Sequence, residues 1–297
     1  MKIKKLLCVL MSGLMIGSGA MMNVHAQDQY KYIMQNYVYH IGKYYFKYGD
    51  FDCNLSYSTS KKGPYTTILK NIYADIYTNG ENVMYEKGNA TEFNMVQYNI
   101  ASQTTKTILK KIVDYDFIGH YILFEKGKKK ETTNQYDINK GTSMKLGNNI
   151  FLIKDDAIDA HHVVLAKNEN KVNATAQAYL GTLTKNGVKL VNTKQRMSLE
   201  GKTLGKNAFY YSQPTYTSPK KNVLKETHCF YKIGYDGKHK KYLGSTTLTC
   251  KTKVYKTKSG KVTKAKTLDK NRIWIIRDHN FTYTNAKYKR MTKKFSK

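Results

Sequence analysis

A recurring pair of short apolar segments constrains the fold of this chain more than any other feature. The clearest copy has the apolar run Ile-Gly-His-Tyr-Ile-Leu-Phe at residues 118–124, followed by Asn-Gln-Tyr-Asp-Ile-Asn-Lys-Gly-Thr-Ser-Met-Lys-Leu at 134–146. Short apolar runs bounded by glycine, asparagine or aspartate are typical of buried strands. Further runs of this kind follow the turn residues Gly42, Gly80, Asp159 and Gly205, at residues 44–46, 83–85, 163–165 and 209–211.

Each apolar run is followed by a second predicted strand that carries a tyrosine, then by a polar turn and a third strand. These tyrosines are Tyr57, Tyr98, Tyr136, Tyr179 and Tyr231, with spacings of 41, 38, 43 and 52 residues. A multi-strand repeat of about 40–50 residues is typical of the blades of a β-propeller, in which neighbouring blades bury each other's faces. The sequence therefore predicts an all-β fold, a single propeller domain over residues 27–297.

We expect six blades, and the last is the weakest copy. It would comprise residues 272–276, Tyr283 and a strand at 287–295, with residues 246–266 forming an extra hairpin around Ser259-Gly260. Asp236-Gly237 is a strong hairpin signal in the fifth copy. The strand near residues 30–39 is expected to close the ring by pairing into the last blade.

The repeated pattern Gly-x-Tyr-Ile-x-Phe, Tyr-x-Ile/Leu, Thr/Gly-Lys-x-x-x-Leu resembles the blades of TolB-like and lipoprotein-receptor-like six-bladed β-propellers. This resemblance covers most of residues 40–295, although the fourth copy lacks the glycine and the fifth has an insertion at 212–227. It implies a scaffold that binds proteins or polymers, and it transfers no catalytic residue. The alternative architecture is a pair of β-sandwich domains divided near residues 195–205.

Residues 1–26 have the pattern of a bacterial secretory signal peptide. Lys2, Lys4 and Lys5 precede an apolar stretch broken by glycines and serines, and Ala26 ends the expected cleavage site. After cleavage, 48 basic residues would face 21 acidic ones, a formal charge of +27 against +30 for the whole chain. We therefore expect a secreted, cell-wall-associated monomer without a transmembrane segment.

A charge of this size favours polyanions as partners. The lysine runs are the candidate binding residues, although each run alone would also suit a soluble hairpin loop. Nucleic acid is compatible with the charge, but the tyrosines sit at repeat positions that suggest packing between blades. The candidate residues are Lys128, Lys129, Lys130, Lys220, Lys221, Lys238, Lys240 and Lys241.

Catalytic and metal-binding chemistry has little support in the sequence. The densest group of ligand-type residues is Asp155, Asp156, Asp159, His161 and His162. Adjacent histidines on a strand point to opposite faces, so a solvated turn is favoured over a metal site. No Gly-x-Ser-x-Gly motif is present. We expect no catalytic residue, metal or cofactor.

The expected mature chain contains three cysteines, an odd number that leaves at least one thiol unpaired. Cys229 and Cys250 are the candidate disulfide pair because they are close in sequence, although the Asp236-Gly237 hairpin would place residue 229 opposite about residue 244. Cys53 lies in an Asp-Phe-Asp-Cys-Asn segment and is expected to be free.

Together these features predict a secreted, non-catalytic binding module for an anionic surface polymer or a protein partner. The alternative is an extracellular enzyme that acts on polysaccharide through carboxylates at the propeller axis.

Overall fold

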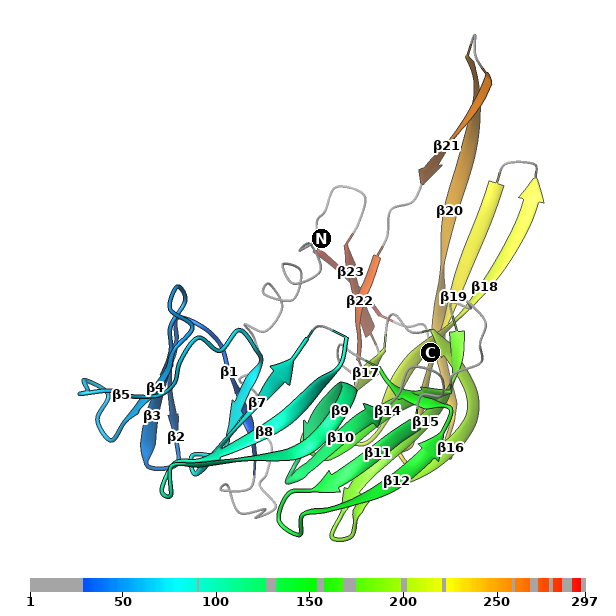
Figure 1. Ribbon diagram of the computed structural model, residues 1–297. Coiled ribbons are helices and arrows are strands. Elements are labelled where there is room, and N and C mark those ends of the chain that lie inside the picture. Colours follow the sequence, from blue (N-terminus) through cyan, green and yellow to red (C-terminus); the bar gives the residue numbers. More distant parts are fainter. Residues whose placement is uncertain are drawn as a thin grey trace.

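The computed structural model describes residues 29–89, 91–126, 132–153, 158–167, 175–198, 202–220, 223–257, 260–267, 272–277, 280–284 and 290–294. These residues form strands, turns and loops, with no helix among them (Figure 1). The expected all-β class is confirmed.

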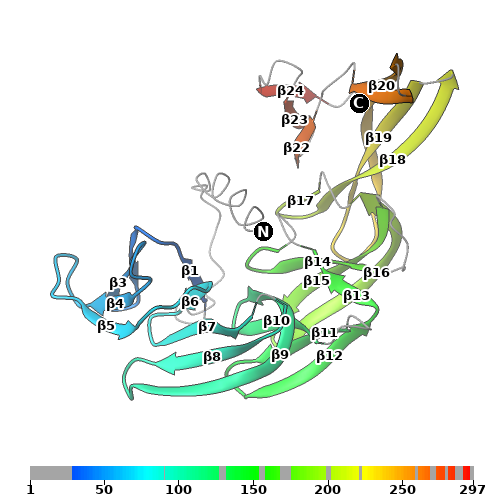
Figure 2. The ribbon, with the colours of Figure 1, turned by 45° about the horizontal axis from the view of Figure 1, so that its top comes forward.

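The strands are arranged as consecutive antiparallel meanders, which we call units one to five (Figure 2). Unit one contains β2 (Val38–Ile41), β3 (Tyr44–Tyr48), β4 (Leu55–Ser58) and β5 (Thr66–Leu69). Unit two contains β6 (Ile76–Thr78), β7 (Asn82–Gly88), β8 (Phe93–Asn99) and the first half of β9 (Thr104–Ile118). Unit three contains the second half of β9, β10 (Tyr121–Lys126), β11 (Thr132–Asp137) and β12 (Thr142–Asn148).

The next two units continue the pattern. Unit four contains β13 (Ile150–Leu152), β14 (His162–Lys167), β15 (Thr175–Thr184) and β16 (Gly187–Ser198). Unit five contains β17 (Thr203–Leu204), β18 (Phe209–Lys220), β19 (Val223–Ile233) and β20 (Lys241–Thr257). The apolar runs of the sequence form the second strand of each unit, and the repeated tyrosines lie on the third.

Units two to four are connected in one twelve-stranded sheet. The long strand β9 pairs with β8 up to Ile112 and with β10 from Ile112 onward, so that it belongs to two units. It changes direction at Lys111, whose φ is 55° and whose N–H donates to the side chain of Asn94. A single parallel pair, Thr132 with Ile150, connects β11 to β13.

Each pair of consecutive units encloses an apolar layer. The first layer, between units one and two, contains Phe46 and Tyr85, and the second, between units two and three, contains Met84 and Phe124. The third, between units three and four, contains Tyr121, Leu123, Val163 and Leu165, and the fourth, between units four and five, contains Val164, Ala166, Phe209 and Tyr211. Layers of this kind between successive small sheets are the packing that a propeller repeat requires.

The second strands of units two, three and four are therefore buried on both faces. On β10, Tyr121 and Leu123 pack into the third layer, whereas Ile122 and Phe124 pack into the second. All four side chains are at most 1% exposed. Because successive residues of a strand point to opposite faces, burial of every residue requires a neighbour on each side. This explains why the sequence shows a continuous apolar run at these positions and no alternation.

The repeated tyrosines pack between the units, as the sequence predicted. Tyr98 lies in the first layer and Tyr136 in the second, while Tyr179 packs against the third and Tyr231 against the fourth. In each of these four cases the tyrosine faces the preceding unit, whereas Tyr57 of unit one packs against the first layer. The prediction that these rings serve packing is confirmed.

The turn that precedes β10 has a specific backbone requirement. Ile118 pairs with Tyr121, so Gly119 and His120 form a two-residue hairpin loop. Gly119 has a φ of 58°, a conformation that favours glycine and suits tight hairpins.

The expected pairing of the N-terminal strand is wrong. β1 (Lys31–Ile33) pairs with β6 of unit two, and Val38 already belongs to unit one. Ile33 is fully buried in the first layer, so the apolar surface of units one and two, which are close in sequence, is sufficient to hold this strand.

Among the described strands, β22 (Arg272–Arg277), β23 (Asn280–Thr284) and β24 (Arg290–Lys294) form a separate three-stranded sheet in the region of the expected sixth copy.

Residues 195–205 do not divide the protein into two domains with separate cores, as the β-sandwich alternative would require. The fourth layer contains Ala178 and Met197 from unit four together with Phe209 and Ile233 from unit five. The expected extra hairpin is present, formed by β20 and β21 (Gly260–Thr267).

Burial of β10 on both faces gives a direct test. Ile122→Ala and Leu123→Ala should each lower the free energy of unfolding by about 2–5 kcal/mol, because each leaves a cavity in a different apolar layer. Denaturant unfolding measures both values. Met144→Ala, at a side chain that is 51% exposed, is the control and should change stability by less than about 0.5 kcal/mol. A near-neutral effect at either Ile122 or Leu123 would show that the strand is buried on one face only.

Candidate functional site

The loop between β19 and β20 holds three of the predicted binding lysines on a defined turn. Gly234 N–H donates to the carbonyl of Lys238 at 2.8 Å, and Gly237 N–H donates to the carbonyl of Gly234 at 2.9 Å. The Asp236 carboxylate accepts a hydrogen bond from the N–H of Lys238 at 2.9 Å. Lys238, Lys240 and Lys241 are all exposed on this loop. The Asp236-Gly237 turn predicted from the sequence is thus confirmed.

Lys240 is fixed by two contacts. Its Nζ donates to Gln195 Oε1 at 2.7 Å and lies 4.2 Å from the centre of the Tyr231 ring. A cation above an aromatic face is attracted by the ring's quadrupole. Lys240 therefore anchors the loop to units four and five, whereas Lys238 and Lys241 are exposed.

The predicted lysines that the structure describes do not all lie at one end of unit five. Lys220 pairs with Val223 at one end of β19, whereas Lys241 pairs with Lys232 at the other end. About ten residues of strand separate these ends, which corresponds to roughly 33 Å. Lys128, Lys129, Lys130 and Lys221 lie outside the described residues.

The candidate binding residues identified from the sequence do not include the lysines of the β20–β21 hairpin. Residues 237–268 contain no aspartate or glutamate, and this acid-free stretch is the signal that identifies them. β20 and β21 pair continuously from Cys250 with Thr267 to Thr257 with Gly260. The lysines of the stretch are Lys238, Lys240, Lys241, Lys251, Lys253, Lys256, Lys258, Lys261, Lys264 and Lys266.

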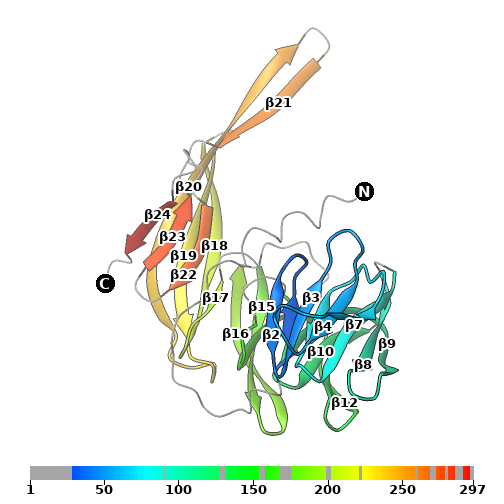
Figure 3. The ribbon, with the colours of Figure 1, turned by 90° about the vertical axis from the view of Figure 1, so that its left-hand side faces the viewer.

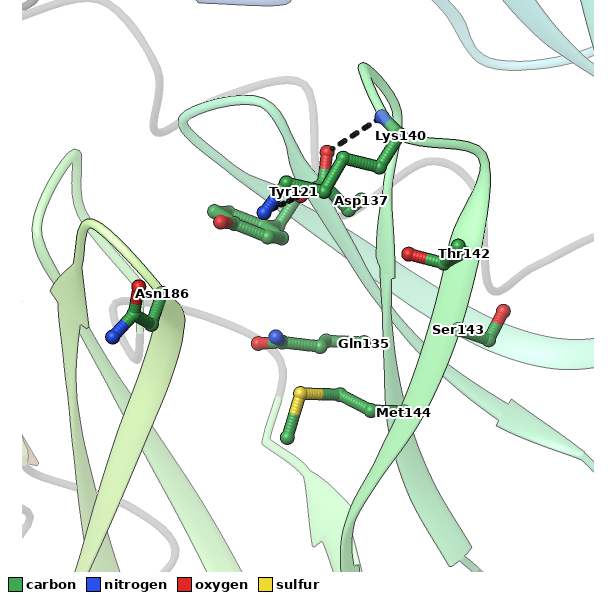
Figure 4. A pocket seen from close by; sticks show the side chains of 8 residues that line it. All are labelled: Tyr121, Gln135, Asp137, Lys140, Thr142, Ser143, Met144 and Asn186. Carbon is green, nitrogen blue, oxygen red and sulfur yellow. Dashed lines mark hydrogen bonds and ion pairs between the residues drawn. The ribbon is translucent and has the colours of Figure 1, made fainter.

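A small polar pocket of about 100 Å³ lies between unit three and the β15–β16 turn (Figure 4). Figure 4 shows Asn186 on the β15–β16 turn across from the other lining residues, with Lys140 directed at Asp137. The lining residues are Tyr121, Gln135, Asp137, Lys140, Thr142, Ser143, Met144 and Asn186.

The polar groups of this pocket hold the structure together. Gln135 Oε1 accepts a hydrogen bond from the N–H of Val188 at 2.8 Å, which connects units three and four. Asp137 Oδ1 accepts from the N–H groups of Asn139 and Lys140 at 3.0 Å, and Lys140 Nζ lies 3.4 Å from Asp137 Oδ2. Burial alone would raise the pKa of Asp137, but the hydrogen bonds of Lys140 and the charges of His120 and Lys140 outweigh it, so the pKa lies below its usual value.

Asp159, His161 and His162 form the described part of the predicted ligand cluster. Asp159 Oδ1 accepts hydrogen bonds from the N–H groups of His161 and His162, both at 2.7 Å, and closes the turn before β14. The His162 ring stacks on Tyr235, with ring centres 3.6 Å apart, and so joins units four and five. No group of three metal-ligating side chains occurs among the described residues, and Asp155 and Asp156 lie outside them.

Ser212, His228 and Glu226 form a hydrogen-bonded chain that the sequence did not suggest. Ser212 Oγ lies 3.3 Å from His228 Nδ1, and His228 Nε2 lies 2.9 Å from Glu226 Oε1. The order of groups matches a serine–histidine–acid triad with the two ring nitrogens exchanged. Ser212, however, is fully buried in the middle of β18, and a nucleophile must be reachable by its substrate. These hydrogen bonds therefore satisfy polar side chains on the adjacent strands β18 and β19.

The candidate disulfide is contradicted. Cys229 has a free thiol and pairs across the strands with Ser245, close to the position 244 that the hairpin predicted. Cys250 pairs with Leu224, five residues further along β20, or about 16 Å at the rise of a strand. A disulfide needs Cα atoms within about 7 Å. Cys53 is a free, buried thiol, as expected.

No protein-family model and no curated protein matches this chain. Among solved structures, it is similar to the β-propeller domain of the Trilobed protease from Pyrococcus furiosus, with 11% identity, a TM-score of 0.38, and coverage of 90% of this chain and 99% of that one. It is also similar to TolB from Acinetobacter baumannii, with 12% identity, a TM-score of 0.30, and coverage of 80% of this chain and 59% of that one. The N-terminal domain of Nup159 gives 7% identity, a TM-score of 0.36, and coverage of 86% and 73%.

These similarities concern the fold alone. TolB, whose blades the sequence pattern resembles, is among the structures found, and this chain spans about three fifths of its length. The propeller-type packing rests on the apolar layers of this chain itself. In the part of the chain that the structure describes, no helix is long and apolar enough to cross a membrane.

The lowered pKa of Asp137 predicts a pH-dependent contribution to stability. Asp137→Ala should lower the free energy of unfolding at pH 7 by about 1–3 kcal/mol, because two backbone N–H groups lose a charged acceptor. The carboxylate's contribution is complete above the unfolded pKa of about 3.9 and is lost as the pH falls through the lower folded value. Urea unfolding of both proteins between pH 7 and pH 3 should show the difference shrinking at acid pH. A constant difference would mean that ionisation of Asp137 is irrelevant.

The cysteine geometry predicts three alkylatable thiols. When the protein lacking residues 1–26 is unfolded without reductant in the presence of iodoacetamide, Cys53, Cys229 and Cys250 should each gain one carbamidomethyl group. Intact mass spectrometry before and after reduction should give the same count. An increase of two groups after reduction would establish a disulfide and contradict the register of β19 and β20.

Proposed function

We propose that this protein is a secreted, non-catalytic binding module that associates with an anionic polymer of the cell surface. The observation that carries this proposal is the acid-free stretch 237–268, which contains ten lysines and includes the β19–β20 loop and the described strands β20 and β21. A local excess of one charge attracts polyanions over distances comparable to the Debye length, about 8–10 Å at physiological salt.

Two further features support binding without catalysis. The described polar clusters at Asp137, Asp159 and Ser212 are engaged in turns and in contacts between strands. The exposed loop lysines Lys238 and Lys241 stand on a turn that hydrogen bonds keep in place. A pre-organised charged loop loses little conformational freedom when it binds, which favours affinity.

A protein partner with an acidic surface would use the same charge. Binding to a polymer depends mainly on charge, whereas a protein interface also requires shape complementarity. Co-sedimentation with cell walls that contain or lack the polymer distinguishes the two kinds of partner.

Co-sedimentation with Gram-positive cell walls tests the proposal. The protein lacking residues 1–26 should sediment with intact walls at low salt, and the bound fraction should fall steeply as salt increases because the attraction is screened. Walls from which teichoic acid has been extracted are the matched control and should retain little protein. Absence of binding at low salt, or equal binding to extracted walls, would overturn the proposal of an anionic wall polymer.

A further inference from the structure

One end of unit one exposes a group of large hydrophobic side chains, most of them aromatic. Eight large hydrophobic side chains of the described residues are exposed, and five of them lie in this part of the chain. The exposed fraction is 96% for Phe51, 74% for Tyr73, 59% for Tyr37 and 45% for Tyr32 and Val38. Single exposed hydrophobic residues are ordinary, whereas a group of them marks an interaction surface. We call these five side chains the aromatic tip.

Hydrogen bonds hold the loops at this end of unit one together. These loops are residues 34–37 between β1 and β2, 49–54 between β3 and β4, and 70–75 between β5 and β6. Asn36 N–H, in the first loop, donates to the carbonyl of Tyr48 at the end of β3, at 3.0 Å. Ile72 N–H, in the third loop, donates to the carbonyl of Cys53 in the second, at 2.9 Å. The aromatic tip is therefore one surface assembled from three connected loops.

The aromatic tip is bordered by acidic residues, although the chain as a whole is strongly basic. The three loops contain the exposed carboxylates Asp50, Asp52 and Asp75 and one basic residue, Lys70, so their formal charge is −2 in a chain of +30. Asp75 Oδ1 accepts a hydrogen bond from the Tyr32 hydroxyl at 3.2 Å, which places a carboxylate beside an exposed ring. Aromatic faces and carboxylates both attract ammonium groups, so this surface fits a partner that presents lysines.

The β19–β20 loop is a described surface of the complementary kind. Residues 234–241 contain three lysines and one aspartate, which gives a formal charge of +2. Lys238 and Lys241 are exposed, and Tyr242 next to them is 53% exposed. The turn around Asp236 and the contact of Lys240 with Gln195 hold this loop in place. Tyrosine is enriched at protein interfaces, and a loop that is already ordered loses little freedom on binding.

The aromatic tip and the β19–β20 loop lie on different parts of the molecule. Units two, three and four stand between units one and five in the series of apolar layers. Figure 3 shows β15 and β16 of unit four between β2 of unit one and β18 of unit five. Every copy of the protein therefore presents both surfaces. A contact between two different surfaces of identical chains joins them head to tail, in rings or in open chains.

We propose that the aromatic tip of one copy of this protein docks on the β19–β20 loop of a second copy. The inference does not rest on the proposed function, because it requires only the protein itself. The second copy is the partner because the same chain carries both surfaces, with opposite charge and with exposed tyrosine on each. The net charge of +30 makes copies repel one another. At physiological salt the Debye length of about 8–10 Å limits this repulsion, so that the charges nearest the contact dominate.

Sedimentation velocity of the protein lacking residues 1–26 tests the contact. A surface of a few side chains corresponds to the small, transient class of interfaces, so we expect association at high protein concentration. At physiological salt the weight-average sedimentation coefficient should rise with concentration. A monomer at every concentration would overturn the inference.

Two variants that each lose one surface give the sharpest measurement. The tip variant combines Asp50→Lys, Phe51→Ser and Tyr73→Ser, and the loop variant combines Lys238→Glu and Lys241→Glu. Each variant alone should remain monomeric at concentrations where the wild type associates. An equimolar mixture should form a heterodimer, because the intact loop of the tip variant meets the intact tip of the loop variant. Association in the mixture also shows that both variants are folded.

Matched control variants separate the two surfaces from net charge and general hydrophobicity. Glu81→Lys with Met144→Ser and Tyr216→Ser makes the same change in charge as the tip variant and removes two exposed side chains elsewhere. Lys61→Glu with Lys62→Glu reverses two exposed lysines in the β4–β5 loop, at the other end of unit one. Both control variants should associate as the wild type does.

Three results would contradict the head-to-tail contact. They are loss of association in a control variant, a mixture of the tip and loop variants that stays monomeric, and association of the loop variant alone, which would mean that the tip meets a surface other than the loop. Cell-wall polymer is absent from all these samples. The self-association and the proposed function can therefore fail independently of each other.

Discussion

Burial of the second strands β7, β10 and β14 on both faces is the constraint on which the rest of the structure depends. The side chains of β10 divide between two apolar layers, and β7 and β14 do the same through Met84 and Val164 and their neighbours. A sheet of this kind exposes a large apolar surface unless another unit covers each side. Units two, three and four are therefore each covered by a neighbour on both sides, and the order of units along the chain becomes the order of layers in space.

Unit five follows the last of the four apolar layers, and this position explains why part of its sheet is exposed. The fourth layer covers Phe209, Tyr211 and Ile233, which lie near one end of β18 and β19. Beyond that layer β18 becomes exposed, from Thr215 onward, and Tyr216 is 49% exposed. The residues of β18 there are Thr215, Tyr216, Thr217, Ser218, Pro219 and Lys220, and they lie outside the fourth layer.

The sequence predicted the repeated strands well and the binding residues incompletely. The apolar runs and the tyrosines mark the second and third strands because complete burial and strand pairing restrict these positions strongly. Lysines on exposed loops obey no such restriction, so the runs of lysine in the sequence indicated Lys238, Lys240 and Lys241 but not the alternating lysines of β20 and β21. The Cys229–Cys250 pairing failed for a related reason, because proximity in sequence does not give the register of two strands.

By itself, the sequence determined the all-β class, the unit length and the two-sided burial, since a run such as Tyr121–Phe124 can only be accommodated between two apolar surfaces. It also determined the formal net charge, which does not depend on the fold. Only the tertiary structure decided which lysines face each other, that β1 joins β6, and that Ser212 is buried beside His228. These are relations between strands, and they depend on register and twist, which are set when the units pack against one another.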